Sequence, residues 1–98
     1  MTIEMKRNAE ELIIEVAGRL DTTSAPMLDK AISEDMGTAK TLTLDLKGVE
    51  YISSAGLRVL LSAQKKMQQI GSMTVKNVCE EVMEIFEMTG FADILVIE

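Results

Sequence analysis

Apolar and polar residues alternate along several short segments, as they do in β-strands with one buried face. The clearest example is Thr41–Leu46, in which Leu42, Leu44 and Leu46 share one side and polar residues the other. Alternation or β-branched composition also predicts strands over residues 2–6, 11–17, 72–78 and 93–97. The polar alternates indicate a sheet face that is not fully covered.

Three segments space their apolar residues three and four apart, as amphipathic helices do. The longest runs from Ser54 to Ile70 and stops at Gly71, and a shorter one covers residues 80–89 before Gly90. A third helix is predicted after residues 22–24, any of which can act as its N-cap, and it ends at Gly37. The order is ββαβαβαβ within one domain, residues 1–98. Because strand and helix alternate after an opening hairpin, we predict an α/β fold with a single-layer mixed, largely parallel β-sheet packed by helices.

The absence of histidine excludes several catalytic functions. Without His, the chain has no Ser-His-Asp or Cys-His catalysis and no imidazole metal site, and its single Cys cannot build a thiolate zinc site or an internal disulfide. The G-x-S-x-G nucleophile motif and the P-loop motif are also missing. We therefore predict a protein that is not an enzyme and that uses no metal and no cofactor.

The net charge of −6 disfavours nucleic acid and anionic membranes as partners. No segment reaches the ~18 apolar residues of a membrane span, and the first residues do not resemble a signal peptide. One unpaired Cys agrees with a reducing compartment. The expectation is a cytoplasmic protein whose partners are proteins or small molecules, with no nucleic acid and no membrane insertion.

The carboxyl ends of parallel strands are where sites form, beside helix N-termini. Segments 18–23, 51–56 and 77–80 are predicted to arrive at that edge. The middle segment contains Ser53 and Ser54, and either can cap the long helix. The first turn of that helix contains no acid, so a phosphate on Ser54 would be well tolerated there. Asp21 is expected either to cap the first helix or to join the same site.

Three segments together resemble the STAS domain of bacterial anti-sigma-factor antagonists. They are Gly18–Asp21, similar to a G-x-L-D signature; Leu44–Leu57, similar to a central block ending in D-S-x-G-L; and Ile85–Phe91, similar to an F-x-x-x-G segment. The resemblance implies a mixed sheet packed by helices. It also implies partner switching, in which the unphosphorylated antagonist binds an anti-sigma factor. That factor is itself a serine kinase, its phosphorylation of the antagonist causes release, and a cognate phosphatase resets the system.

Carried over by position, Ser54 matches the phosphorylated serine of the family. Ser53 stands where the motif has Asp, which makes Ser53 the alternative acceptor. The partner-binding edge is expected to contain Asp21, Thr22, Ser53, Gly56, Arg58 and Ser62. One alternative is a non-switching STAS accessory subunit of a transporter ATPase or another protein complex, in which Ser54 only caps its helix. A nucleotide-binding sensor ranks last, because nothing in the sequence supplies base or ribose contacts.

Overall fold

The computed structural model describes residues 1–35, 37 and 39–98. Its elements follow the predicted order as far as the last helix. They are β1 (Thr2–Asn8), β2 (Glu11–Leu20), α1 (Ala25–Asp35), β3 (Thr41–Ile52), α2 (Ser54–Ile70), β4 (Ser72–Lys76), α3 (Glu80–Thr89) and a short 3-10 helix, η1 (Phe91–Asp93).

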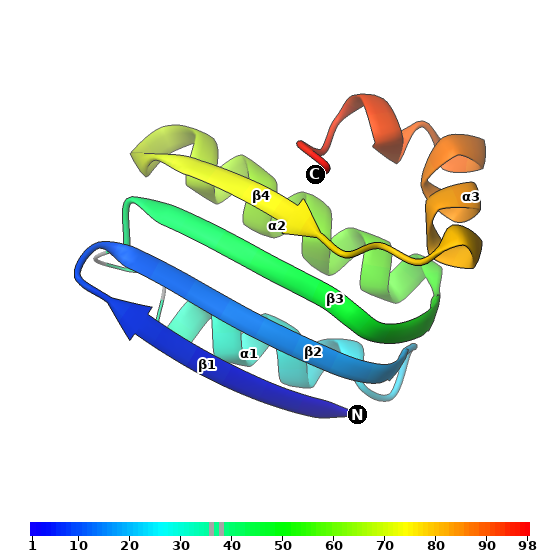
Figure 1. The fold of residues 1–98 in the computed structure, drawn as a ribbon, viewed down its shortest axis with the longest axis horizontal. Coiled ribbons are helices and arrows are strands. Elements are labelled where there is room, and N and C mark those ends of the chain that lie inside the picture. Colours follow the sequence, from blue (N-terminus) through cyan, green and yellow to red (C-terminus); the bar gives the residue numbers. More distant parts are fainter. Residues whose placement is uncertain (36, 38) are drawn as a thin grey trace.

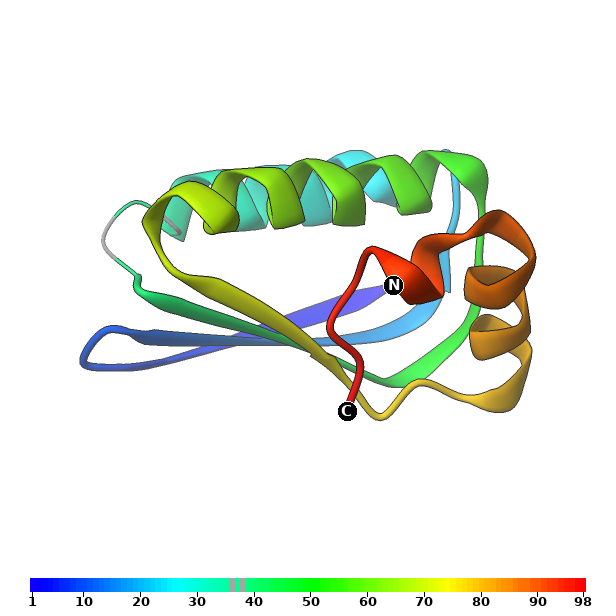
Figure 2. The same cartoon turned by 90° about the horizontal axis from the view of Figure 1, so that it is seen from above.

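The four strands form one mixed sheet in the order β1-β2-β3-β4. β1 and β2 are antiparallel, whereas β2–β3 and β3–β4 are parallel. Helices α1 and α2 lie on one face of this sheet and leave the other face open, and α3 lies beyond one end of the strands (Figures 1 and 2). This arrangement confirms the predicted α/β class, the largely parallel sheet and its uncovered face.

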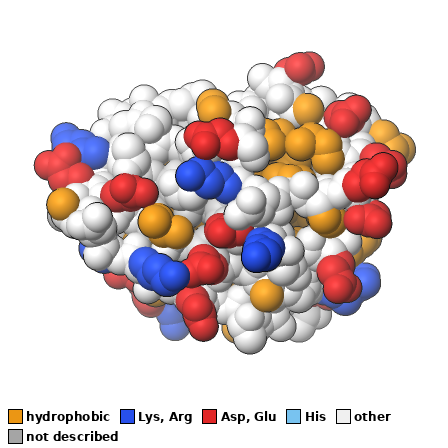
Figure 3. Space-filling view, viewed as in Figure 1, with side chains coloured by type: hydrophobic (Ala, Val, Ile, Leu, Met, Phe, Trp, Pro, Cys, Tyr) orange, Lys and Arg blue, Asp and Glu red, His pale blue; other side chains and the backbone are white. Residues whose placement is uncertain are grey.

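The core lies between the sheet and the two long helices. Alternate residues of the strands point inward, among them Leu44 of β3 and Val75 of β4, both fully buried. Helix α2 adds Leu60 and Met67, which are fully buried as well. Burying each such side chain contributes roughly 1.5–3 kcal/mol, so this layer contact is what holds α2 against the sheet. On the open face, charged side chains of both signs are scattered across the view, and an apolar area lies towards α3 (Figure 3).

The middle strands are longer than the sequence pattern predicts. We expected Gly18 to end its strand, but β2 continues through Gly18, whose φ is 104°, to Leu20. β3 likewise continues to Ile52, with two register shifts against β2 at which β3 carries an extra residue. At each such bulge the two strands stay paired, but the extra residue of β3 changes which of its side chains face each side of the sheet. As a result, both strands reach the same edge, and Leu20 pairs with Ile52.

The prediction of a last strand over residues 93–97 is wrong. After Gly90, which adopts the left-handed conformation, the chain turns through η1. There the carbonyl of Phe91 accepts hydrogen bonds from the N–H groups of Ile94 and Leu95, at 3.0 and 2.9 Å. Because the N–H groups of Ile94 and Leu95 are bonded within that turn, they do not pair with β4, and the segment contacts β4 at one isolated bridge between Val75 and Ile97. The apolar composition of the segment instead reflects Leu95, which is buried.

Candidate functional site

The strand ends bring the predicted segments together at one edge. The Ser53 N–H donates to the Leu20 carbonyl at 2.8 Å, which joins the end of β2 to the start of α2. The third segment is tied to the same end of the sheet, because the Cys79 thiol donates to the Val49 carbonyl at 3.3 Å. Figure 2 shows α3 at the end of the molecule where α2 begins. The parallel topology therefore places the three segments as predicted.

Two adjacent serines begin α2, and the structure separates their roles. Ser53 is the N-cap, with extended φ and ψ of −93° and 175°. Its side-chain oxygen accepts a hydrogen bond from the Gly56 N–H at 3.3 Å. Ser54 is the first helical residue and is exposed to solvent. The capping function thus falls to Ser53, and the Ser54 hydroxyl is accessible at the helix start.

The N-terminus of α2 is electrostatically uncompensated by its own first turn, which contains no acid. By contrast, α3 begins with Glu80 and Glu81, which complement the positive end of that helix. Along α2, Arg58 and Ser62 follow Ser54 at intervals of four, so the three share one stripe. Arg58 is exposed and Ser62 is half-buried. An anion attached at Ser54 would meet free helix N–H groups and a cation one turn away.

Gly56 allows α2 to approach the sheet closely. A Cβ at this position would lie 2.8 Å from Ile52 Cγ1 and 2.8 Å from Leu20 Cγ. Those side chains end the two central strands, so Gly56 sets the height of the helix start above the edge. Gly56 is itself buried. The predicted partner-binding position at Gly56 is therefore a packing position within the site.

Asp21 organises the turn between β2 and α1. Its Oδ1 accepts hydrogen bonds from the N–H groups of Thr23 and Ser24, both at 3.0 Å. In return the Ser24 hydroxyl oxygen accepts from the Asp21 N–H at 2.9 Å, a reciprocal arrangement like a capping box. The hydrogen bond from the Ser24 backbone, supported by the Ser24 hydroxyl, the Thr23 N–H and the charge of Arg19, lowers the pKa of Asp21. Thr22 is exposed within this turn.

Sequence reasoning did not assign a role to Arg19 or Tyr51, which lie at the same edge. The second register shift pairs them across β2 and β3. The Arg19 guanidinium stacks 4.4 Å from the centre of the Tyr51 ring, and its Nε lies 4.0 Å from Asp21 Oδ2. Tyr51, the only tyrosine of the chain, is 38% exposed. Arg and Tyr are common anchors of protein interfaces, but only the bulged register makes them neighbours.

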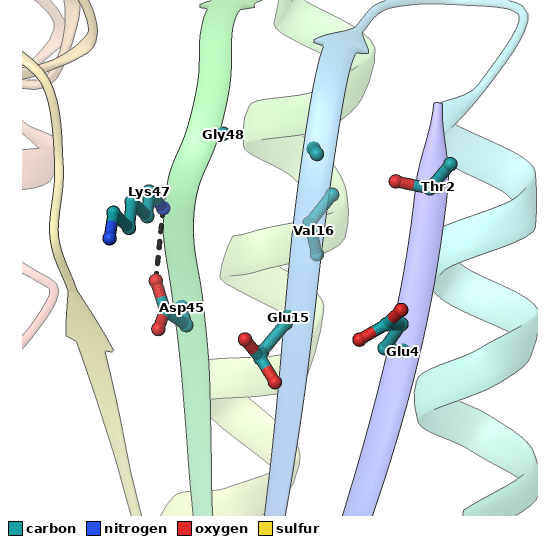
Figure 4. A pocket seen from close by; sticks show the side chains of 8 residues that line it. Thr2, Glu4, Glu15, Val16, Asp45, Lys47 and Gly48 are labelled. Atoms are coloured by element: carbon teal, nitrogen blue, oxygen red, sulfur yellow. Dashed lines mark hydrogen bonds between the residues drawn. The ribbon is translucent and has the colours of Figure 1, made fainter.

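A hollow of about 470 Å³ lies elsewhere, on the open face of the sheet (Figure 4). Ala17 and Gly48 line its floor and have no long side chain to fill it. The two residues lie so close that a Cβ on Gly48 would be 2.5 Å from Ala17 Cβ. The side chains of Glu4, Glu15 and Asp45 line it. Asp45 Oδ1 is occupied by hydrogen bonds from the Lys47 N–H and the Asn77 amide, at 3.0 and 3.1 Å. Within the described part of the chain, no group of His, Cys, Asp or Glu is arranged to hold a metal ion.

Comparison with known proteins identifies the family. The family model described as "STAS domain" matches residues 2–98, and the chain belongs to the STAS domain family. An anti-sigma-B factor antagonist of Bacillus subtilis is 31% identical over 96 residues, covering 97% of this chain and 88% of that protein. The recognition of the family from its three sequence motifs is thereby confirmed.

Solved structures show the same fold. An anti-sigma factor antagonist from Mycobacterium paratuberculosis aligns with a TM-score of 0.87 at 23% identity, covering 98% of this chain and 83% of that one. The Bacillus cell fate determinant SpoIIAA in its phosphorylated form aligns with a TM-score of 0.77 at 16% identity, covering 99% and 91%. Among the described residues, no helix has both the length and the apolarity to cross a membrane.

Proposed function

We propose that this chain is an anti-sigma-factor antagonist that works by partner switching. Unphosphorylated, it binds an anti-sigma factor through the edge formed by the Asp21 turn and the start of α2. The role is supported by similarity to anti-sigma-B factor antagonists across nearly the whole chain. The observation that carries the switch is local: Ser53 caps α2, which leaves Ser54 exposed beside free helix N–H groups.

The switching reaction is a phosphoryl transfer supplied by the partner. The anti-sigma factor, acting as a serine kinase, transfers the γ-phosphoryl group of ATP to Ser54 Oγ. A new O–P bond forms, the bond from the γ-phosphorus to the bridging oxygen breaks, ADP leaves, and a base of the kinase takes the hydroxyl proton. A phosphatase then uses water to release inorganic phosphate. The antagonist contributes an accessible hydroxyl and no catalytic group, consistent with a binding protein.

Phosphorylation would change binding mainly through desolvation. Phosphate adds a charge of about −1.5 to −2 at pH 7. In the free protein that charge faces the helix N–H groups and Arg58, one turn further along, and is well solvated. Within an interface it would be buried near Asp21 and against acids or apolar groups of the partner. Each 1.4 kcal/mol of that cost corresponds to about tenfold in affinity, so a few kcal/mol would release the partner.

Ser54 is preferred over Ser53 as the acceptor because of what each hydroxyl already does. The Ser53 oxygen accepts the Gly56 N–H, and Ser53 is half-buried. Phosphorylating it would remove the cap and force a dianion against the packed start of α2. Ser54 can carry the phosphate with the cap intact. The proposed partner contacts are Asp21, Thr22, Ser53, Arg58 and Ser62, with Arg19 and Tyr51 added from the structure.

The test is affinity capture from the native host with four baits: wild type, Ser54→Glu, Ser54→Ala and Ser33→Glu. We expect wild type and Ser54→Ala to retain an anti-sigma factor with a kinase domain and Ser54→Glu to lose it. Phosphosite mapping of the native protein should place phosphate on Ser54. The Ser33→Glu bait is the matched control, because it adds the same charge at an exposed position of α1, and it should still bind.

Two results would contradict the proposal. Phosphate on Ser53 alone would assign the switch to the other serine. Equal capture of one partner by all four baits, a transporter ATPase in particular, would make the chain a constitutive accessory subunit.

A further inference from the structure

The charge of the chain is segregated along the sequence. Lys76 is the last basic residue, and the residues after it contain six acids, whereas residues 1–76 contain as many Lys and Arg as Asp and Glu. The whole net charge of −6 therefore resides in residues 77–98. The acids there are all exposed: Glu80, Glu81, Glu84, Glu87, Asp93 and Glu98. We refer to the surface of residues 80–98 as the acidic pole.

Most of these acids have no cation beside them. Lys76 Nζ lies 3.8 Å from Glu98, and it is the nearest basic residue in the sequence. Among the residues that the structure describes, the other five acids form no ion pair, whereas on β1 and β2 Lys6 and Glu15 pair at 2.7 Å. Unpaired like charges on one short helix repel one another. The acidic pole thus carries a negative potential that an added cation would relieve.

Exposed apolar side chains occupy the same surface. Met88 is 86% exposed, Val96 55% and Ile94 43%. On α3 the buried residues are Val82 and Phe86, and Met88 lies on the opposite, outward face, one turn after Glu84. Figure 3 shows apolar side chains gathered over the region of α3 and the C-terminal segment, with acidic side chains beside them. Exposed apolar area bordered by polar residues is typical of an interaction surface.

We propose that the acidic pole docks an amphipathic helix of a partner protein, one that carries Lys or Arg beside its apolar residues. The apolar side of such a helix would cover Met88, Ile94 and Val96, and its cations would meet the acids around them. The charge selects this occupant over others. Anionic membranes and nucleic acid would be repelled, and a second copy would present the same acids.

This surface does not include Asp21 or Ser54, although α3 begins at the same end of the sheet as α2. We expect it to bind its partner whether or not Ser54 carries phosphate. A test that leaves Ser54 unchanged therefore distinguishes failure of this inference from failure of the proposed function.

The experiment titrates isotope-labelled protein with a synthetic amphipathic helix of Leu and Lys and follows amide shifts by NMR. A peptide of the same pattern with Glu in place of Lys is the control probe. We expect the Lys peptide to shift amides confined to residues 80–98, with affinity that weakens as salt is added, and the Glu peptide to shift none. Sedimentation of the free protein should show no self-association through this surface, so that Met88→Ser leaves the sedimentation coefficient unchanged.

Matched variants separate the two components of the surface. Glu84→Lys combined with Glu87→Lys should lower the affinity for the Lys peptide by at least about tenfold. The control, Glu10→Lys combined with Asp29→Lys, makes the same change of charge elsewhere and should lower the affinity much less. Met88→Ser with Val96→Ser should weaken it too, whereas Met27→Ser, 53% exposed on α1, should not. All these positions are exposed, and thermal unfolding verifies that each variant folds.

Four results would overturn the inference. Shifts spread over acids throughout the molecule would show general attraction to a negative protein. Equal weakening by the two charge-reversal pairs would show the same. Binding of the Glu peptide would remove the charge argument, and self-association blocked by Met88→Ser would assign the surface to a second copy.

Discussion

At the residue level, the two serines at the start of α2 are expected to differ in their effect on stability. Ser53→Ala removes the cap of the Gly56 N–H and should cost about 1 kcal/mol. For a chain of this size that corresponds to a fall in Tm of roughly 4–8 °C. Ser54→Ala removes only an exposed hydroxyl and should leave Tm nearly unchanged. Thermal unfolding of both variants checks this, and equal losses would show that the cap is shared.

Gly56 is expected to be intolerant of the smallest substitution. Ala favours helix over Gly by about 1 kcal/mol, but its Cβ would lie 2.8 Å from Ile52 and Leu20 side-chain atoms. The packing cost of about 1–3 kcal/mol should dominate, so Gly56→Ala should unfold at lower denaturant concentration than wild type. Gly37→Ala is the control, because nothing lies within 4 Å of its added Cβ. A stabilised Gly56→Ala variant would mean that α2 shifts freely over the strand ends.

Asp21 should make stability depend on pH in the acid range. Its pKa is held below the ordinary value of 3.8, mainly by the hydrogen bond from the Ser24 backbone. A lowered folded-state pKa stabilises the fold above the unfolded pKa, and this stabilisation is lost as pH falls through the folded one. The Tm difference between wild type and Asp21→Asn should therefore be largest above about pH 4 and shrink below it. A difference that stays constant with pH would contradict this role.

At the level of elements, the C-terminal segment should be the least protected part of the sheet. Among the described residues, its backbone hydrogen bonds to β4 all involve Val75, whose N–H donates to the Val96 carbonyl and whose carbonyl accepts from the Glu98 N–H. β3, in contrast, is paired on both sides. Amide hydrogen exchange should be much faster at Glu98 than at Leu44, in the centre of β3. Equal protection would mean that the segment behaves as a full fifth strand, as its composition had suggested.

The helices were predictable because local chemistry fixes their ends. α2 spans Ser54–Ile70 and α3 spans Glu80–Thr89, as expected from apolar spacing and terminal glycines, together with a serine cap on α2 and acids in the first turn of α3. The strand ends were not predictable in the same way. Whether β2 continues past Gly18 depends on pairing with a bulged β3, and whether Asp93–Ile97 forms a strand depends on the turn after Gly90. Both are decided by tertiary contacts that composition does not encode.

The features of the candidate site likewise fall into those that local sequence predicts and those that tertiary contacts decide. Its position followed from the parallel topology, and the candidate serines from their place at a helix start. Which serine caps depended on where the helix begins, a boundary that shifts by one residue or more in any sequence reading. The stacking of Arg19 on Tyr51 depended on the register shift between β2 and β3, so no local pattern could reveal it.

At the level of the whole molecule, the proposed switch requires no change of fold. Leu57, Leu60 and Met67 hold the inner side of α2 in the core, while Ser54 lies at its exposed start. A charge added at Ser54 therefore acts on the surface and not on the packing. It should also interact favourably with the helix N-terminus, by about 0.3–1 kcal/mol. Stability and partner affinity are thus expected to move independently.

Ser54→Glu tests that independence directly. Its Tm should equal or slightly exceed that of wild type, while its affinity for the anti-sigma factor recovered with wild type should fall by at least about tenfold. Ser33→Glu adds the same charge at an exposed position in the last turn of α1, far from the edge; it should leave the affinity unchanged and lower Tm slightly, because an acid there opposes the helix dipole. Calorimetric titration and thermal unfolding provide the two measurements. A fall in Tm that parallels the loss of affinity would show that release occurs by loosening α2, and a loss shared by Ser33→Glu would attribute it to net charge alone.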